Sequence, residues 1–523
     1  GMFAFALWDR RDRRLDLVRD RLGQKPLYWA WTPRGFAFAS ELRALLAVPG
    51  FSPEIDRDAL TQLLRRGAIA APWSVFRGAR KLQPGHRLRV TADGVAAGRR
   101  QVDERAYWSV LRVFEEGAAR PLAGDDGELT DAVEALIGDA VEAATVSDVP
   151  LGAFLSGGVD SSLVVALLAD RRAAPRTFTI GFGDPRYDES EPAAAIARHL
   201  GTRHETLHVG EDEALAVVPE LPEIYDEPLA DPSQVPTALL ARLARRHVTV
   251  ALSGDGGDER FAGYEHYRLL ARLAALGRLP RPLLAGGAAA LAWLPEGTRL
   301  ARLGRFLVAA RSPEEVHLRL VSVWKRPAEL VIGAAEPPAL LVRPAGWPRI
   351  ADPVRRAQAL DAATYLPDDV LAKVDRAAMA VSLETRVPLL DHRVVELAAR
   401  LPGRLLVRGG RGKWVLRQVL ARHLPAELVD RPKRGFSVPL DAWLRGALRD
   451  WAEALLAPER LRREGVFAVD AVRGVWEEHL AGHGDRGLYL WPLLSFQAWR
   501  ERWCDGRGAL SAPAGPARAV ADG

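Results

Sequence analysis

The stretch FLSGGVDSS, residues 154–162, limits the possible fold more than any other part of this chain. It follows an apolar segment, 150–155, that predicts a buried strand, and it leads into an apolar segment, 162–168, that predicts a helix. A glycine turn between a strand and a helix directs several backbone N–H groups to one point, which favours anions. Ser156 and Ser161 can add hydroxyl donors, and Asp160 can hold magnesium against phosphate oxygens. We therefore predict a phosphate-binding loop; the alternative is a flexible Gly-Ser turn.

The loop is similar to one known type of phosphate-binding loop and differs from another. Its pattern SGGxDS resembles the pyrophosphate-binding loop of ATP pyrophosphatases, which cleave ATP to AMP and pyrophosphate. A Walker loop would continue with Gly-Lys-Ser or Gly-Lys-Thr, and this loop does not. The resemblance implies that the nucleotide is ATP.

Length and composition exclude several classes of protein. The chain has 523 residues, enough for two or three domains, and its net charge of +5 is spread without a basic run, so we expect no nucleic-acid partner. Cys504 is the only cysteine, which excludes a disulfide framework and a thiolate metal cage. The longest apolar stretch, 284–294, is too short to cross a bilayer, and no signal peptide is visible. We expect a cytoplasmic protein without a membrane partner.

The first 108 residues predict a β-rich domain. Short apolar runs separated by charged or Pro/Gly turns indicate strands, and two segments indicate helices. The expected strands are 3–9, 15–20, 27–31 and 35–40, and the expected helices are 41–47 and 57–65. A linker is expected over 109–128, because its second half is rich in Pro, Gly and acidic residues.

Residues 129–503 predict a second domain of the α/β class. Strands and helices alternate in its first part, which implies a parallel sheet covered by helices, with ligands at the carboxyl ends of the strands. The expected helices are 129–144 and 189–200, and the expected further strands are 177–182, 204–208 and 248–252. From about 265 the chain is mostly helical, and residues 504–523 are expected to be disordered.

A second glycine-rich motif, LSGDGGDE at 252–259, follows the last predicted strand and should lie beside the first loop. Its glycines let the backbone approach a ligand closely. Its three acids, Asp255, Asp258 and Glu259, cannot all enter an apolar core unpaired, whereas facing a triphosphate and magnesium would satisfy them. The alternative is an acidic surface turn.

Three further motifs follow in the helical part. Residues 365–392 place charged residues on a largely apolar helix, which favours internal ion pairs over ligand contacts for most of them. Lys413 lies near a helix start, and 431–439 form a loop. Arginine outnumbers lysine 66 to 6, so a retained lysine, such as Lys373 or Lys413, can mark a position that needs a compact ammonium; chance is the alternative.

Together the motifs resemble the glutamine-dependent asparagine synthetase family from residue 1 to about 500, in the same order. The opening segments 1–7, 20–28 and 38–41 resemble the end of that family's N-terminal-nucleophile glutaminase domain. The residue sequences around both glycine motifs are similar to those of the bacterial branch of the family that is found with cell-surface polysaccharide and exosortase systems. The resemblance implies a remnant of an αββα glutaminase domain, then a parallel-sheet ATP-pyrophosphatase domain (adenine nucleotide alpha hydrolase-like) with a helical C-terminal part.

The resemblance also implies site residues. Asp160 and Asp258 match the magnesium-binding aspartates, and Lys413 matches a lysine that stabilises charge on the α-phosphate and on the acyl-adenylate. Asp255 stands where well-studied members have a glutamate, implicated in forming the intermediate and in accepting a proton from ammonia; here the carboxylate is one methylene shorter. The implied ATP-binding residues are Leu155 (through its backbone), Ser156, Gly157, Gly158, Asp160, Ser161, Ile180, Ser253 and Gly254.

The family's reaction implies the substrates. ATP activates the side-chain carboxylate of L-aspartate as an adenylate with release of pyrophosphate, and ammonia from glutamine then gives asparagine and AMP. Another carboxylate, such as a sugar acid of a cell-surface polysaccharide or a β-lactam precursor, is an open alternative, because the acceptor pocket is not placed by any motif. A tRNA-modifying enzyme and a non-catalytic scaffold are disfavoured, the latter because Asp160, Asp258 and Lys413 are retained.

The glutaminase half departs from the family. Members use an N-terminal cysteine whose own amine acts as base, and Cys504 lies at the far end of this chain. We expect that an N-terminal segment is missing and that the chain as given uses free ammonia only; glutaminase activity would contradict this. A homodimer is a further possibility.

Overall fold

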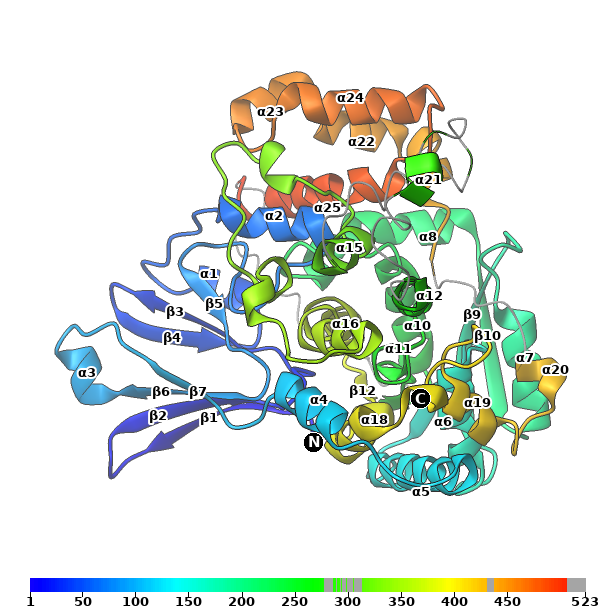
Figure 1. Cartoon of the computed structure of the whole chain (residues 1–523). Coiled ribbons are helices and arrows are strands. Elements are labelled where there is room, and N and C mark those ends of the chain that lie inside the picture. Colours follow the sequence, from blue (N-terminus) through cyan, green and yellow to red (C-terminus); the bar gives the residue numbers. More distant parts are fainter. Residues whose placement is uncertain are drawn as a thin grey trace, which may run out of the picture.

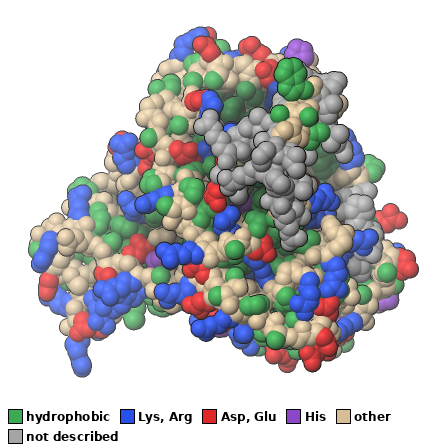
Figure 2. Space-filling model, viewed as in Figure 1, with side chains coloured by type: hydrophobic (Ala, Val, Ile, Leu, Met, Phe, Trp, Pro, Cys, Tyr) green, Lys and Arg blue, Asp and Glu red, His purple; other side chains and the backbone are tan. Residues whose placement is uncertain are grey.

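The computed structural model describes residues 1–276, 313–429 and 437–505, and within 277–312 residues 286–287, 289–291, 293, 298 and 304. The predicted tail beyond Asp505 and most of the predicted loop at 431–439 lie outside the described residues. On the face shown in Figure 2, basic and acidic side chains are interspersed. In the described part of the chain, no helix has the length and apolar character needed to cross a membrane.

The N-terminal lobe contains two antiparallel sheets, as the β-rich pattern predicts (Figure 1). Leu17, Trp29 and Leu88 are buried in one apolar cluster between them. The first sheet has the order β1 (Ala4–Asp9), β2 (Arg14–Arg19), β6 (His86–Thr91), β7 (Asp103–Ala106), and the second has the order β4 (Gly35–Ala39), β3 (Tyr28–Thr32), β5 (Ala79–Lys81). The helices of the lobe are α1 (Leu42–Leu46), α2 (Arg57–Arg66) and α3 (Ala92–Ala96).

The segment expected to be a linker contains helix α4 (Val110–Ala119). Ser109 caps it by accepting a hydrogen bond from the Arg112 N–H. Val110, Phe114 and Gly117 form one buried face at helical spacing, which packs against α16 (Pro353–Ala363) and α18 (His392–Arg400). The helical spacing of the apolar residues determines the structure of 110–119. The Pro, Gly and acidic residues in the second half of 109–128 do not.

The predicted parallel sheet is confirmed and has five strands among the described residues. Every neighbouring pair is parallel. The order is β10 (Arg203–Val209), β9 (Arg176–Phe182), β8 (Leu151–Phe154), β11 (Val250–Leu252), β12 (Glu384–Arg386). The first helices of this part are α5 (Asp126–Ala144), α6 (Val159–Ala169), α7 (Ser190–His199), α8 (Glu211–Val217), α9 (Leu221–Ile224) and α10 (Gln234–Arg245).

The fifth strand, β12, lies in a segment that we expected to be helical. Residues 365–392 instead form a π-helical turn (Leu366–Val370), helix α17 (Leu371–Met379), a tight turn and then β12. Ser382 in this turn has a φ of 56°, a left-handed conformation that ends the helix. The strand has three residues and pairs with β11 on one side. It is too short for an alternation of apolar and polar residues to be recognised in the sequence.

Most of the remaining described residues are helical, as expected, and their helices lie beside the parallel sheet and the N-terminal lobe (Figure 1). Helix α2 of the lobe packs against α25, far away in the sequence. The remaining described helices are α11 (Gly257–Arg260), α12 (Glu265–Leu276), α15 (Pro313–Leu320), α19 (Trp414–Leu420), α20 (Ala426–Val429), α21 (Leu440–Arg445), α22 (Arg449–Leu455), α23 (Pro458–Glu464), α24 (Val469–Leu480) and α25 (Gly487–Trp503).

Candidate active site

The two glycine loops meet at the carboxyl ends of adjacent strands β8 and β11. A Cβ atom on Gly254 would lie 2.6 Å from the backbone nitrogen of Ser161, and one on Gly257 would lie 2.4 Å from Oδ1 of Asp160. No side chain fits at Gly254 without moving the backbone of the first loop, and none fits at Gly257 without moving the Asp160 carboxylate. The loops are therefore in direct contact, as the sequence predicts.

The first loop is held by its own hydroxyls. The hydroxyl oxygens of Ser156 and Ser161 lie 3.0 Å apart, and Ser161 Oγ also accepts the Ser156 N–H at 3.2 Å. Gly157 has a φ of 73°, which a glycine adopts without strain. Helix α6 begins at Val159, three residues earlier than predicted, so Asp160 and Ser161 belong to its first turn. The loop thus presents a helix N-terminus together with two hydroxyls.

Lys413 crosses from the helical part to both loops. It precedes α19, has a φ of 56°, and its N–H donates to the carbonyl oxygen of Phe261 at 2.9 Å. Its Nζ contacts Asp160 Oδ2 and lies 2.8 Å from Asp258 Oδ1. Burial alone would lower the pKa of Lys413, but the two carboxylates outweigh it and raise the pKa above its ordinary value. The lysine is a fixed positive charge between the two aspartates predicted to bind magnesium.

Asp255 lies beside this trio. Its Oδ2 accepts a hydrogen bond from the Ser253 hydroxyl at 2.5 Å. Burial raises the pKa of Asp255, while the hydrogen bond from Ser253 and the charge of Lys373 oppose that rise. The carboxyl is thus held by its own loop.

Leu155 and Ile180 occupy less direct positions. The N–H of Leu155 donates to the carbonyl oxygen of Phe178 at 2.9 Å, so it is already engaged with strand β9. The side chains of Leu155 and Ile180 are only 1% and 2% exposed and belong to apolar clusters. Their predicted part in nucleotide binding remains a prediction.

A second charged group near Asp255 was not predicted as a site. Lys373 on α17 forms an ion pair with Asp231, which also accepts hydrogen bonds from the N–H and hydroxyl of Ser233 at 2.8 Å. Asp369, from the π-helical turn, lies near Asp231, whose negative charge raises the pKa of Asp369. Two sequence signals indicated this group: the charged residues of 365–392, for which we expected internal ion pairs, and the retention of Lys373 in a lysine-poor chain. Asp231 gave no signal.

The donors around Lys413 suit magnesium. Asp160 and Asp258 supply hard carboxylate oxygens, which Mg²⁺ prefers, and they already enclose one cation, the Lys413 ammonium. No group of three or more His, Cys, Asp or Glu able to hold a metal occurs in the described ranges. A magnesium ion at these two aspartates would take its remaining ligands from phosphate oxygens and water.

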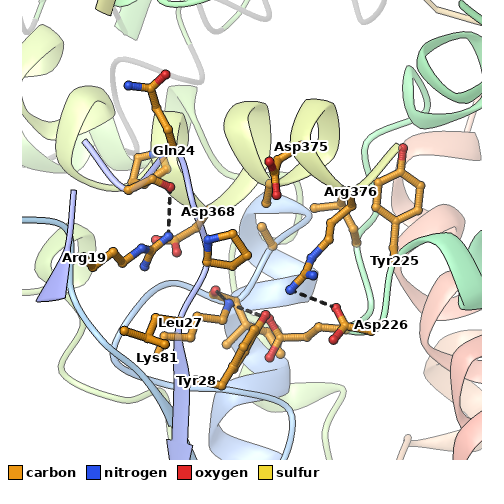
Figure 3. A pocket seen from close by; sticks show the side chains of 18 of the residues that line it. Arg19, Gln24, Leu27, Tyr28, Lys81, Tyr225, Asp226, Asp368, Asp375 and Arg376 are labelled. Carbon is orange, nitrogen blue, oxygen red and sulfur yellow. Dashed lines mark hydrogen bonds and ion pairs between the residues drawn. The ribbon is translucent and has the colours of Figure 1, made fainter. Parts of the chain in front are cut away.

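A cavity, here called the interface cavity, lies between the N-terminal lobe and the helical part (Figure 3). Arg376 on one wall forms an ion pair with Asp226 at 3.2 Å, and Lys81 of β5 pairs with Glu227. The lining residues of the lobe include Arg19, Gln24, Leu27, Tyr28, Ala68 and Lys81, and those of the other part include Tyr225, Asp226, Glu227, Asp368, Asp375 and Arg376. The junction of the two parts is therefore polar and hollow.

Comparisons with known proteins agree with these features. Residues 132–501 match the family model of asparagine synthase, and residues 1–108 match that of the glutamine amidotransferase domain. The chain is 37% identical over 514 residues to a "Putative asparagine synthetase" (glutamine-hydrolyzing) of Mycobacterium tuberculosis, covering 95% of this chain and 76% of that protein. It is 30% identical over 506 residues to asparagine synthetase 1 (glutamine-hydrolyzing) of Bacillus subtilis, with 95% and 77% covered. Amidase chyE of Penicillium rubens is 26% identical over 546 residues, with 93% and 77% covered.

An amidotransferase domain followed by a synthase domain defines a class of enzymes that join nitrogen to carbon. Within this class the chain belongs to the asparagine synthase family. It is a carbon–nitrogen ligase of the glutamine-hydrolysing asparagine synthetase type, as the sequence motifs predict.

Proposed function

We propose that this enzyme activates the side-chain carboxylate of L-aspartate with ATP and then transfers ammonia to it, giving asparagine, AMP and pyrophosphate. The observation that carries the proposal is the position of Lys413, whose ammonium contacts Asp160 of the first loop and Asp258 of the second. The three residues come from separate parts of the chain and meet where the carboxyl ends of β8 and β11 adjoin. The match of 1–108 to an amidotransferase domain supports glutamine as the source of ammonia.

The loops would bind the triphosphate of ATP. The N-terminus of α6 favours negative charge, and the backbone of Gly157 and Gly158, with the hydroxyls of Ser156 and Ser161, surrounds that end of the helix. Gly254 allows the second loop to close against the first. We infer that Ser253 and Gly254 frame the nucleotide from this side, with Leu155 and Ile180 behind it.

Lys413 would stabilise the reaction's developing charge. When the carboxylate attacks the α-phosphorus, negative charge grows on the phosphate oxygens, and a preorganised ammonium lowers the barrier because it needs no reorientation. When bound at Asp160 and Asp258, magnesium would neutralise further phosphate charge. The pKa of Lys413 is raised, so its side chain stays protonated throughout the neutral range.

The acceptor could instead be another carboxylate, such as a sugar acid of a cell-surface polysaccharide. One relative, chyE, carries the name amidase, so names within the matched set differ. The loops around Lys413 would serve either acceptor, because they act on ATP.

Pyrophosphate release measured with ATP, magnesium and ammonium, with and without L-aspartate, tests the proposal. We expect release to depend on aspartate and mass spectrometry to identify asparagine. Release that requires a uronic acid and does not depend on aspartate would support the same ATP-dependent activation with a different acceptor. If none of the acids tested gives carboxylate-dependent pyrophosphate release, the ligase proposal for this chain is contradicted.

A further inference from the structure

A second cavity, here called the inner cavity, lies next to the interface cavity. Ala68 and Asp368 line both of them, so the two adjoin at these residues. Arg66 of α2, with Tyr365 and Asp369 of the helical part, forms another portion of the inner cavity's wall. A small molecule leaving the N-terminal lobe through the interface cavity would meet this wall next.

Asp369 is one of two groups in that wall with a buried polar atom that lacks a hydrogen-bond partner among the described residues; the other is the Gln62 amide, a donor through its Nε2. Its side chain is 3% exposed, and its Oδ1 has no hydrogen-bond partner among the residues that the structure describes. A buried carboxyl oxygen without a donor destabilises the folded protein, so such an atom usually serves a ligand or water. The free oxygen calls for a donor from a small polar molecule in the inner cavity.

Asp369 is also connected to the candidate active site. The charge of Asp231 acts on Asp369, Asp231 is paired with Lys373, and the charge of Lys373 acts on Asp255 of the second loop. The inner cavity therefore borders a chain of charged groups that leads to Asp255 of the second loop. The titratable and charged groups acting on or with Asp369 are Asp231, Lys373, Arg66, Tyr225 and Tyr365.

We propose that Asp369 is a further catalytic residue, which accepts an N–H hydrogen bond from ammonium in the inner cavity and takes one of its protons. The proposal rests on the ligase function proposed above and names the group that prepares its nucleophile. Ammonium has no lone pair and cannot attack an acyl carbon, whereas ammonia can. A carboxylate at the end of the cavity removes this obstacle.

The step balances as a proton transfer followed by acyl transfer. One N–H bond of ammonium breaks and an O–H bond forms on the Asp369 carboxylate, which leaves a lone pair on nitrogen. That pair forms the C–N bond, the C–O bond to AMP breaks, and AMP leaves with its electrons; the attacking nitrogen loses one more proton to the departing phosphate. Asp369 then returns its proton to solvent.

The surroundings of Asp369 favour this direction of transfer. Burial, and next the neighbouring Asp231 carboxylate, raise the pKa of Asp369 well above the ordinary aspartate value. A proton is therefore held more strongly on Asp369 than on an exposed carboxyl, and a neutral pair of ammonia and carboxylic acid is favoured over two ions in a buried site. Asp255 is engaged by Ser253 and is one methylene shorter than the family's glutamate, so a second proton acceptor is chemically useful here.

The variant Asp369→Asn tests the proposal, with hydroxylamine as the comparison nucleophile. Hydroxylamine is mostly neutral at neutral pH and needs no initial deprotonation, whereas ammonia is mostly protonated. We expect the ratio of amide formation from ammonium to hydroxamate formation from hydroxylamine to fall about 10²-fold, the usual size of a lost acid–base group. Carboxylate-dependent ATP–pyrophosphate exchange, which reports adenylate formation alone, should stay within a few-fold of the wild type.

Asp368→Asn is the matched control. Asp368 is the adjacent residue of the same π-helical turn, is buried and lines the same cavity, but its Oδ2 already accepts the Ala71 N–H at 3.2 Å. Its variant should keep the wild-type ratio of the two nucleophiles. An unchanged ratio in Asp369→Asn would overturn the proposal, including the case in which the rates with both nucleophiles fall equally. If the wild type shows no carboxylate-dependent exchange, the ligase function itself fails, which is a different result.

The pH profile of the wild type gives a second test that does not depend on a folded variant. If Asp369 deprotonates ammonium, kcat/KM for total ammonia should level off above the pKa of Asp369, before the pH reaches the pKa of ammonium. If the enzyme takes only neutral ammonia from solution, kcat/KM should keep rising up to the pKa of ammonium. A continued rise in the wild type would overturn the proposal. The Asp369→Asn variant, which lacks the base, is expected to show this continued rise.

Discussion

Replacing Lys413 with alanine is expected to lower carboxylate-dependent pyrophosphate release about 10²- to 10³-fold while ATP still binds. The ammonium of Lys413 is fixed between Asp160 and Asp258, and it acts on charge that appears only as the adenylate forms. Loss of such a group lowers kcat more than it weakens ground-state binding. Initial rates of pyrophosphate release and nucleotide binding by calorimetry would separate the two effects.

The same change also removes the partner of two aspartates that lie close to it. Breaking a buried ion pair commonly costs about 3–5 kcal/mol of folding stability, so the rates must be compared below the unfolding temperature of each variant. Lys25→Ala is the control, because Lys25 forms an ion pair with Asp375 at 2.6 Å outside the two loops. We expect this control to lose stability and keep its rate. Full activity of a folded Lys413→Ala protein would remove the lysine from the mechanism.

The central part of the site could be predicted from sequence because it depends on local patterns. An apolar run, a glycine turn and a second apolar run define β8, the first loop and α6, and the second glycine motif follows β11 in the same way. Parallel strands then bring the two loops to one edge, whichever residues lie between them. The contact of Gly254 with the backbone of Ser161 is the direct result.

Other features could not be predicted because their causes lie far apart in the chain. Asp231 and Lys373 are separated by 142 positions, and neither stands in a pattern that indicates the other. The short strand β12 exists because β11 offers it hydrogen bonds, which is a tertiary cause. Helix α4 was missed for a different reason: its apolar period was present, but the polar residues that follow it dominated the interpretation of 109–128.

Gly263→Ala is expected to lower both activity and stability, although it adds a single methyl group. The residue follows the second loop, and a Cβ atom there would lie 2.0 Å from Asp258 Oδ1 and 2.1 Å from Cε of Lys413. Either side chain must move, and overpacking of this kind costs about 1–3 kcal/mol. A displacement of about 1 Å at a catalytic group can lower a rate about 10²-fold, so we expect a loss of 10- to 100-fold in pyrophosphate release.

Gly474→Ala is the control for this prediction, since Gly474 lies within α24, is exposed, and has no atom within 4 Å of the added methyl group. Alanine favours a helix over glycine by about 1 kcal/mol, so this variant should unfold at the same or a higher temperature with an unchanged rate. Thermal unfolding and pyrophosphate release, measured on both variants, give the comparison. If Gly263→Ala keeps the wild-type rate, Lys413 and Asp258 tolerate displacement, and the close arrangement around the lysine ammonium does not control adenylate formation.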